Sequence, residues 1–259
     1  MHPRCQGRAH LLQEGQRTEL MFRTAFKNDE IEFLCAEEDY GIIPTPYPSK
    51  KNIPDWFKAL PMKLGNQGLQ TSTIKRCNPF LDALSVGYII PLAADVEFVS
   101  NSDGSGVDFK WMFHKNMVET HNPKQISSEK CPNPSDPRPP MKFLNWWMIK
   151  TPPEYSLLFL PPLNRVEDRF VCYSGIVDHP YFQYEYVNFP FIFTKNDFRG
   201  VVEAGTPLMQ VIPIRKDSLL LTHSCRQVSE EDKKNTGWMR KMKTLVNQSV
   251  YRNHIHRKL

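Results

Sequence analysis

The chain has 259 residues, a formal net charge of +5 and 40% hydrophobic residues. This length suits one large β domain or two small ones, and no Gly/Ser-rich linker divides the chain, so one domain with extensions is favoured. The longest apolar runs are far shorter than the ~20 residues that a membrane-spanning helix needs, so no membrane partner is expected. The 22 prolines exceed the ordinary share of about 5%, which favours a loop-rich β protein over a helical bundle.

Most of the positive charge lies near the C-terminal end. Residues 226–259 hold nine Lys and Arg against three acidic residues, whereas the rest of the chain holds 24 basic and 25 acidic residues. The body is therefore nearly neutral, and binding to nucleic acid is not expected except through this basic tail.

The six cysteines are far apart and show no C-x-x-C or zinc-ribbon spacing. The N-terminal residues contain no apolar core of a signal peptide. Both observations favour free thiols in a reducing compartment over disulfides. The expected location is the cytoplasm, which would be the host cytoplasm if the protein is viral.

The first third of the chain contains few regular elements. Residues 1–28 are polar and without a sustained period, which predicts a flexible extension. The run I-E-F-L-C from Ile31 predicts a first strand. Prolines then interrupt both ladders and helices in residues 41–61, where Asp55 can cap a single helical turn, Trp56 to Leu60.

A second helix and a hairpin follow. A helix is predicted over Pro79 to Ser85, with Asn78 as its cap and Gly87 after its end. Two alternating runs around Asp103-Gly104 predict the clearest hairpin of the chain.

The aromatic and β-branched stretch from Trp146 to Ile214 predicts several short strands joined by tight turns. One more strand is expected over Ser218 to Thr222. The spacing of Ser229 and Asp232 is typical of a helix start, and an apolar stripe of that tail helix is expected to dock on the body or on a partner. The stripe consists of Trp238, Met242 and Leu245.

These elements predict a mainly β protein, with a single antiparallel β-sandwich or β-clip-like domain over residues 29–225. Short helices interrupt that domain, and residues 226–259 form a basic helical tail. Two roles remain open for the aromatic residues. Either all of them pack in the core, or some of them line a pocket for a ligand.

Common catalytic and metal-binding motifs are absent from the sequence. It contains no G-x-S-x-G, P-loop or G-x-G-x-x-G motif, and its eight histidines lack the spacing of a zinc site. No metal site is therefore predicted.

Four short motifs place polar side chains in or beside strands, and the first of them places Asp95 inside an otherwise apolar strand. They read A-A-D-V-E-F at Ala93, P-P-L-N-R at Pro161, G-I-V-D-H-P-Y at Gly175 and G-T-P-L-M-Q-V-I at Gly205. In this order they resemble the motifs of the dUTPase and dCTP deaminase superfamily, which has a β-clip fold and binds a nucleotide between subunits. The second motif has Leu163-Asn164 where that superfamily has Ser-Gly.

The resemblance implies roles for particular residues. Asp178 would be the catalytic acid that orients water, and Mg²⁺ would be needed only if this likeness extends to the chemistry; otherwise no cofactor is expected. The implied partners are a small anionic ligand and further copies of the chain. The ligand-binding residues would be Asp95, Asn164, Arg165, Tyr181 and Gln210.

From Ile31 to Ile214 the chain also resembles a family of unknown function found in bacteria and their viruses. The segments that carry this likeness include I-P-D-W-F-K, P-P-E-Y-S-L-L-F and V-N-F-P-F. The likeness implies no activity.

Two function classes therefore remain open. One is a β-clip-like protein that binds a small molecule or nucleotide in a pocket where Asp178 and Arg165 meet. The other is a non-enzymatic structural or host-interaction scaffold, in which those two residues form an ion pair at a sheet corner.

Overall fold

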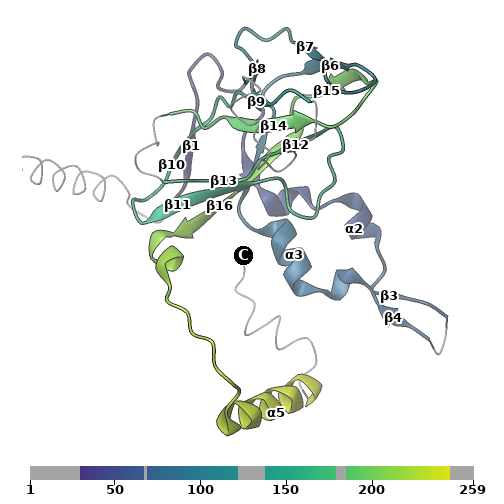
Figure 1. The fold of residues 1–259 in the computed structure, drawn as a ribbon, viewed down its shortest axis with the longest axis vertical. Coiled ribbons are helices and arrows are strands. Elements are labelled where there is room, and N and C mark those ends of the chain that lie inside the picture. The colour runs from purple at the N-terminus through teal and green to yellow at the C-terminus, as the bar shows by residue number, and fades with distance from the viewer. Residues whose placement is uncertain (1–29, 67–68, 122–137, 179–184, 246–259) are drawn as a thin grey trace, which may run out of the picture. The chain divides into compact units, whose positions relative to one another are not determined.

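The computed structural model describes residues 30–66, 69–121, 138–178 and 185–245 (Figure 1). The predicted extension 1–28 lies outside these residues. The chain divides into two compact units, residues 1–216 and 217–259, and each is described by itself. The division falls before residue 226, where the basic composition begins.

The first unit is built from short antiparallel strands. Strand accounts for 34% and helix for 17% of the structure, which confirms the predicted mainly β class. The largest sheet has the order β13-β11-β16-β5-β2. Its strands are β2 (Tyr47–Pro48), β5 (Tyr88–Pro91), β11 (Tyr155–Leu160), β13 (Gly175–Val177) and β16 (Pro207–Arg215).

Three smaller sheets pack around a common core with the large one. Their orders are β12-β14-β9-β8, β15-β6-β7 and β1-β10. The strands are β1 (Glu32–Leu34), β6 (Val96–Ser100), β7 (Val107–Lys110), β8 (Val118–Thr120), β9 (Met141–Phe143), β10 (Met148–Lys150), β12 (Phe170–Cys172), β14 (Phe189–Phe193) and β15 (Arg199–Val202).

Phenylalanines from several sheets form the centre of this core. Phe143 stacks on Phe191 with ring centroids 3.8 Å apart, and Phe98 stacks on Phe193 at 4.7 Å. All four are fully buried. Each such pair adds about 0.5–1.5 kcal/mol to the burial of its area. The Phe143–Phe191 pair stabilises one sheet, whereas the Phe98–Phe193 pair joins two sheets.

The helices of the first unit are short, as predicted. They are η1 (Ser49–Asn52), α2 (Asp55–Ala59), η2 (Ile74–Arg76) and α3 (Asn78–Ser85). Asn78 is the first residue of α3 and makes no cap, because Cys77 occupies the capping position without a side-chain bond. Gly87 follows the helix with φ +71°, and a Cβ there would lie 2.1 Å from the Val211 carbonyl oxygen. Only glycine allows this close approach of α3 to β16.

The hairpin predicted around Asp103-Gly104 is confirmed, since β6 pairs with β7 from Ser100 opposite Val107 onward. The strand predicted over Ser218 to Thr222 is wrong, because the chain forms a 3₁₀ turn, η3 (Lys216–Leu220), instead. The last pair between β16 and β11 is Arg215 with Tyr155, the first residue of β11. Strand β11 therefore offers no residues with which the chain after Arg215 could pair.

In the described part of the second unit, η3 is followed by the helix α5 (Glu230–Leu245). Ser229 Oγ accepts from the backbone N–H of Asp232 (3.1 Å), and Asp232 Oδ2 accepts from the N–H of Ser229 (2.8 Å). This reciprocal capping confirms the predicted helix start. The predicted apolar stripe of Trp238, Met242 and Leu245 lies outside the described side chains.

Candidate functional site

Arg165 braces the ends of two helical segments. Its Nη2 donates to the carbonyl oxygens of Ser49 (3.1 Å), Asn52 (3.0 Å) and Leu84 (2.8 Å), and Nη1 donates to the carbonyl of Leu163 (3.2 Å). The first two carbonyls belong to η1 and the third to the last turn of α3, where unpaired acceptors favour a cation. Burial lowers the pKa of Arg165. Most of its donors are therefore directed at the backbone and away from any ligand.

Gln210 is fully buried and joins the large sheet to α3. Its Nε2 donates to the carbonyl oxygens of Ala83 (3.0 Å) and Val86 (2.6 Å), and its Oε1 accepts from the N–H of Leu163 (2.8 Å). The side-chain amide thus connects β16 both to the end of α3 and to the loop that carries Arg165. This is a structural use of a residue that the sequence placed in a binding site.

Asp95 and Asn164 are exposed and belong to turns. Asp95 was expected inside an apolar strand, but it precedes the first residue of β6, and its Oδ1 accepts from the N–H of Ala204 (2.7 Å) in the β15–β16 turn. Asn164 has φ +56°, a left-handed conformation that asparagine tolerates better than most residues. Its Nδ2 donates to the carbonyl of Phe80 (3.4 Å).

Asp178 follows β13 and has a half-exposed side chain. Its Oδ1 lies 2.6 Å from Lys216 Nζ and accepts from Ser156 Oγ at 3.2 Å. The carboxylate therefore ties three neighbouring strands at one end of the sheet. Tyr181, the implied neighbour of Asp178, lies outside the described residues.

The structure does not bring Asp178 and Arg165 together. Val177 lies opposite Leu157, near the start of β11, whereas Arg165 follows Leu160 at the other end of that strand. Asp178 follows Val177 and so lies level with Ser156, and the four steps of strand from Ser156 to Leu160 span about 13 Å at ~3.3 Å per residue. The chain between Arg165 and Asp178 also contains β12, which pairs with β14 in another sheet.

A small cavity of about 240 Å³ adjoins the loop that carries Arg165. Its walls are mostly apolar and come from residues 161–167, β12 and the start of β16. Cys172 lines it and is only 3% exposed. Burial raises the pKa of the Cys172 thiol well above its ordinary range.

Cys172 is expected to resist alkylation in the folded protein, because the thiolate is the reactive form and burial suppresses it. Iodoacetamide at about pH 8 should modify the exposed Cys77 and Cys225 but leave Cys172 intact until urea unfolds the chain. Peptide mass spectrometry of samples taken with and without urea measures each site. Equal labelling of Cys172 and Cys77 without urea would contradict this burial.

The sequence did not predict a charge cluster that surrounds the buried carboxylate of Asp39. The Asp39 side chain is 0% exposed, and Lys115 Nζ lies 2.6 Å from its Oδ2 and 2.9 Å from Glu38 Oε1. His114 Nε2 lies 3.2 Å from Asp39 Oδ1, an ion pair only when the imidazole is protonated. The hydrogen bond to Asp39 raises the pKa of Lys115. No sequence pattern links these groups, because 76 residues separate Asp39 from Lys115.

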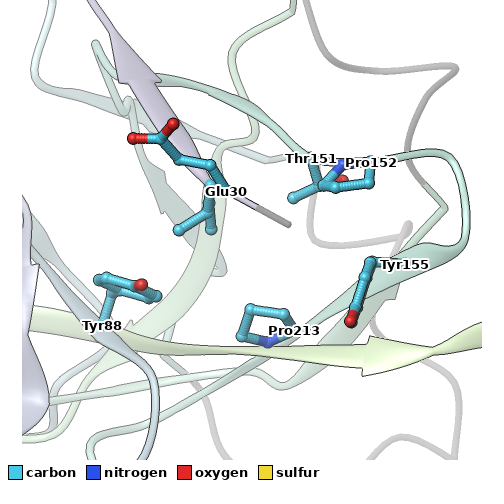
Figure 2. Close-up of a pocket in the computed structure, with 7 residues that line it drawn as sticks. Glu30, Tyr88, Thr151, Pro152, Tyr155 and Pro213 are labelled. Atoms are coloured by element: carbon cyan, nitrogen blue, oxygen red, sulfur yellow. The ribbon is translucent and has the colours of Figure 1, made fainter. Parts of the chain in front are cut away.

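The largest cavity among those described has a volume of about 520 Å³ and lies beside the large sheet. Figure 2 shows Tyr88, Pro213 and Tyr155 along one side of it, with Thr151, Pro152 and Glu30 opposite. Ile31 completes the lining. We call this cavity the tyrosine pocket.

Strand register explains the position of the tyrosine pocket. Tyr88 lies opposite Val211 in β16, and Pro213 lies opposite Leu157 in β11. Because alternate residues share a face, Tyr88, Pro213 and Tyr155 project from three neighbouring strands toward the same side. Strand β5 begins at Tyr88, opposite Val211, so on the β5 side of β16 no residue pairs with Pro213. A proline, which has no backbone N–H, is tolerated at such an edge position.

Thr151 contributes an unusual polar atom to this pocket. The residue is 1% exposed, and its Oγ1 has no hydrogen-bond partner among the described residues. A buried hydroxyl without a partner costs about 1–3 kcal/mol. Such a group is uncommon in folded proteins.

Within the described residues, no group of three or more His, Cys, Asp or Glu side chains is arranged to hold a metal ion. The same part of the chain contains no helix long and apolar enough to cross a membrane. No protein-family model matches the chain, and no curated protein is similar to it.

Proposed function

We propose that the β domain binds a small neutral ligand in the tyrosine pocket. The observation that carries this proposal is the unpartnered buried hydroxyl of Thr151 in the wall of an open cavity. The volume of about 520 Å³ falls within the ~300–1,000 Å³ typical of sites for small molecules.

The lining indicates the chemistry of the ligand. Two tyrosine rings, two prolines and an isoleucine offer apolar surfaces to a ring, while three hydroxyl groups and the carboxylate of Glu30 offer hydrogen bonds. This combination suits a hydroxylated ring such as a sugar or a nucleoside.

The same lining disfavours phosphate. Among the described residues that line it there is no Lys, Arg or His, although phosphate sites rely on cations or on helix N-termini. The nucleotide-binding proposal from the superfamily resemblance would instead need Arg165 and Asp95, whose polar groups contact the backbone. A neutral ligand in the tyrosine pocket is therefore the better supported version of small-molecule binding.

The proposal is tested by saturation-transfer NMR with a panel of hexoses, N-acetylhexosamines and deoxynucleosides, with dUTP and dCTP added as anionic probes. At least one neutral compound is expected to bind, and its affinity is then measured by calorimetry. In Thr151→Val, which keeps the shape but removes the hydroxyl, affinity should fall about tenfold, the equivalent of one hydrogen bond.

Thr151→Val should also leave the unfolding free energy unchanged or slightly higher, because the hydroxyl has no partner to lose in the part of the chain that the structure describes. Thr120→Val, on the exposed strand β8, is the matched control and should not change affinity. Binding of triphosphates alone, or equal affinity of wild type and Thr151→Val, would contradict the proposal.

A further inference from the structure

An arm extends from the first unit beyond its sheets. It comprises residues 54–66 and 69–77 and contains α2, η2 and a two-stranded sheet, β3 (Lys63–Leu64) with β4 (Thr71–Ser72) (Figure 1). This sheet pairs with no other described strand. Isolated two-stranded hairpins are marginal in water, so the hairpin would gain from a covering partner.

The root of the arm is firmly packed. Phe57 is 4% exposed and stacks on Phe80 of α3, with ring centroids 5.6 Å apart. Thr73 binds across the base of the hairpin, where its N–H donates to the carbonyl of Met62 (3.1 Å). Gly65 has φ +112°, and a Cβ there would lie 2.5 Å from the Leu69 carbonyl oxygen, so the turn requires glycine. The arm is thus held in place at its base.

Apolar side chains of the arm are exposed in and beside the hairpin. Leu64 lies opposite Thr71 in the hairpin, while Met62 precedes β3 and Leu69 lies in the loop before β4. Met62 is 47% exposed, Leu64 53% and Leu69 86%. Apolar side chains gathered in this way on a surface mark an interaction site.

Charge restricts what can cover the arm. The arm carries four basic residues and one acidic residue, and Lys50 and Lys51 precede it. Two arms repel each other for this reason, and the basic tail is no better a partner. The remaining described residues between 30 and 216 hold 13 basic and 18 acidic residues, so the body of the first unit has the opposite sign.

The body also has an exposed surface with matching chemistry. Residues 30–48 contain five acidic residues and no basic one. Within them, Tyr40 is 75% and Ile42 68% exposed, next to the exposed carboxylate of Glu37. We call residues 36–42 the acidic turn. Lys115 pairs with Glu38 and Asp39, so the negative charge that the turn offers to a partner is carried mainly by Glu37. The turn thus combines uncovered apolar area with negative charge, as the arm combines apolar area with positive charge.

We propose that the arm of one copy docks on the acidic turn of a second copy. Leu64 and Leu69 cover Tyr40 and Ile42, while Lys63 approaches Glu37. Because every copy carries both surfaces, two copies can exchange arms about a twofold axis, which closes the assembly as a dimer. This homo-oligomer is a scaffold-type interaction and does not depend on the tyrosine pocket.

The oligomeric state tests this proposal. Light scattering coupled to size exclusion should give twice the chain mass for the full-length protein at micromolar concentration. Leu64→Asp and Leu69→Asp on the arm, and Ile42→Lys on the acidic turn, should each weaken the dimer at least tenfold. Raising NaCl from about 50 to 500 mM should also weaken it, because salt screens the charge attraction.

Leu221→Asp is the matched control, since Leu221 is 78% exposed and lies in the second unit. It should remain dimeric, and urea unfolding should show that all variants are folded. A monomeric wild type at about 100 µM, or dimers that persist in both Leu64→Asp and Ile42→Lys, would overturn the proposal. So would a monomer that binds phosphatidylserine vesicles or single-stranded DNA through Leu64.

Discussion

Replacement of Arg165 by alanine is expected to lower the free energy of unfolding by about 3 kcal/mol, because several backbone carbonyls lose a charged donor. The acceptors left behind are those of Ser49, Asn52 and Leu84. Arg165→Lys should recover only part of the loss, since an ammonium group lacks the planar fork that reaches η1 and α3 together.

Urea titration followed by tryptophan fluorescence measures the effect of these substitutions. Arg199→Ala is the matched control, because the Arg199 side chain is 79% exposed and its ion pair with Glu97 is 3.8 Å long. That variant should change stability by less than about 0.5 kcal/mol. If Arg165→Ala were as stable as wild type, Arg165 would not stabilise η1 and α3, and it would again be a candidate ligand-binding residue.

Gln210→Leu is expected to lower the unfolding free energy by a similar amount, about 3 kcal/mol, although leucine has nearly the same volume. The substitution leaves the carbonyls of Ala83 and Val86 and the N–H of Leu163 without their partner. Each of these groups is partly buried, so water replaces the lost hydrogen bond only in part.

A melting temperature about 6–12 °C below that of wild type would correspond to this loss in a protein of comparable size. Gln70→Leu is the control, because Gln70 is exposed and lies between β3 and β4. A change of less than about 1 kcal/mol in Gln210→Leu would mean that α3 does not depend on this amide.

Both substitutions affect how loss of binding is interpreted. A variant of Arg165 or Gln210 that fails to bind a ligand has also lost packing between α3 and the sheet, so it does not identify a contact with that ligand. Thr151→Val avoids this difficulty, because the Thr151 hydroxyl has no partner among the described residues whose loss would destabilise the fold. It therefore separates binding from folding.

The sequence by itself determined the class of fold and several local elements. Alternation of apolar and polar residues identified strands, and the turn at Asp103-Gly104 joined β6 and β7 as predicted. Helix α3 and the reciprocal cap at the start of α5 were also confirmed. These features depend on interactions between residues close in the chain, so a single sequence contains the information for them.

The tertiary structure alone decided which strands pair and which polar residues meet. An alternating pattern specifies which side chains face inward but not which strand lies alongside, and so β12 joined a different sheet from β11 and β13. Arg165 and Gln210 acquired backbone partners in α3 that are more than 80 residues away in sequence.

The tyrosine pocket is the clearest example of a feature that the sequence alone did not predict. Its lining comes from five separate segments: the residues before β1, β5, the β10–β11 connection, β11 and β16. No spacing in the sequence relates Tyr88 to Thr151 or Pro213, because their proximity follows from register between strands and from β5 beginning at Tyr88. The pocket is therefore a consequence of how sheets pack, which only the folded chain determines.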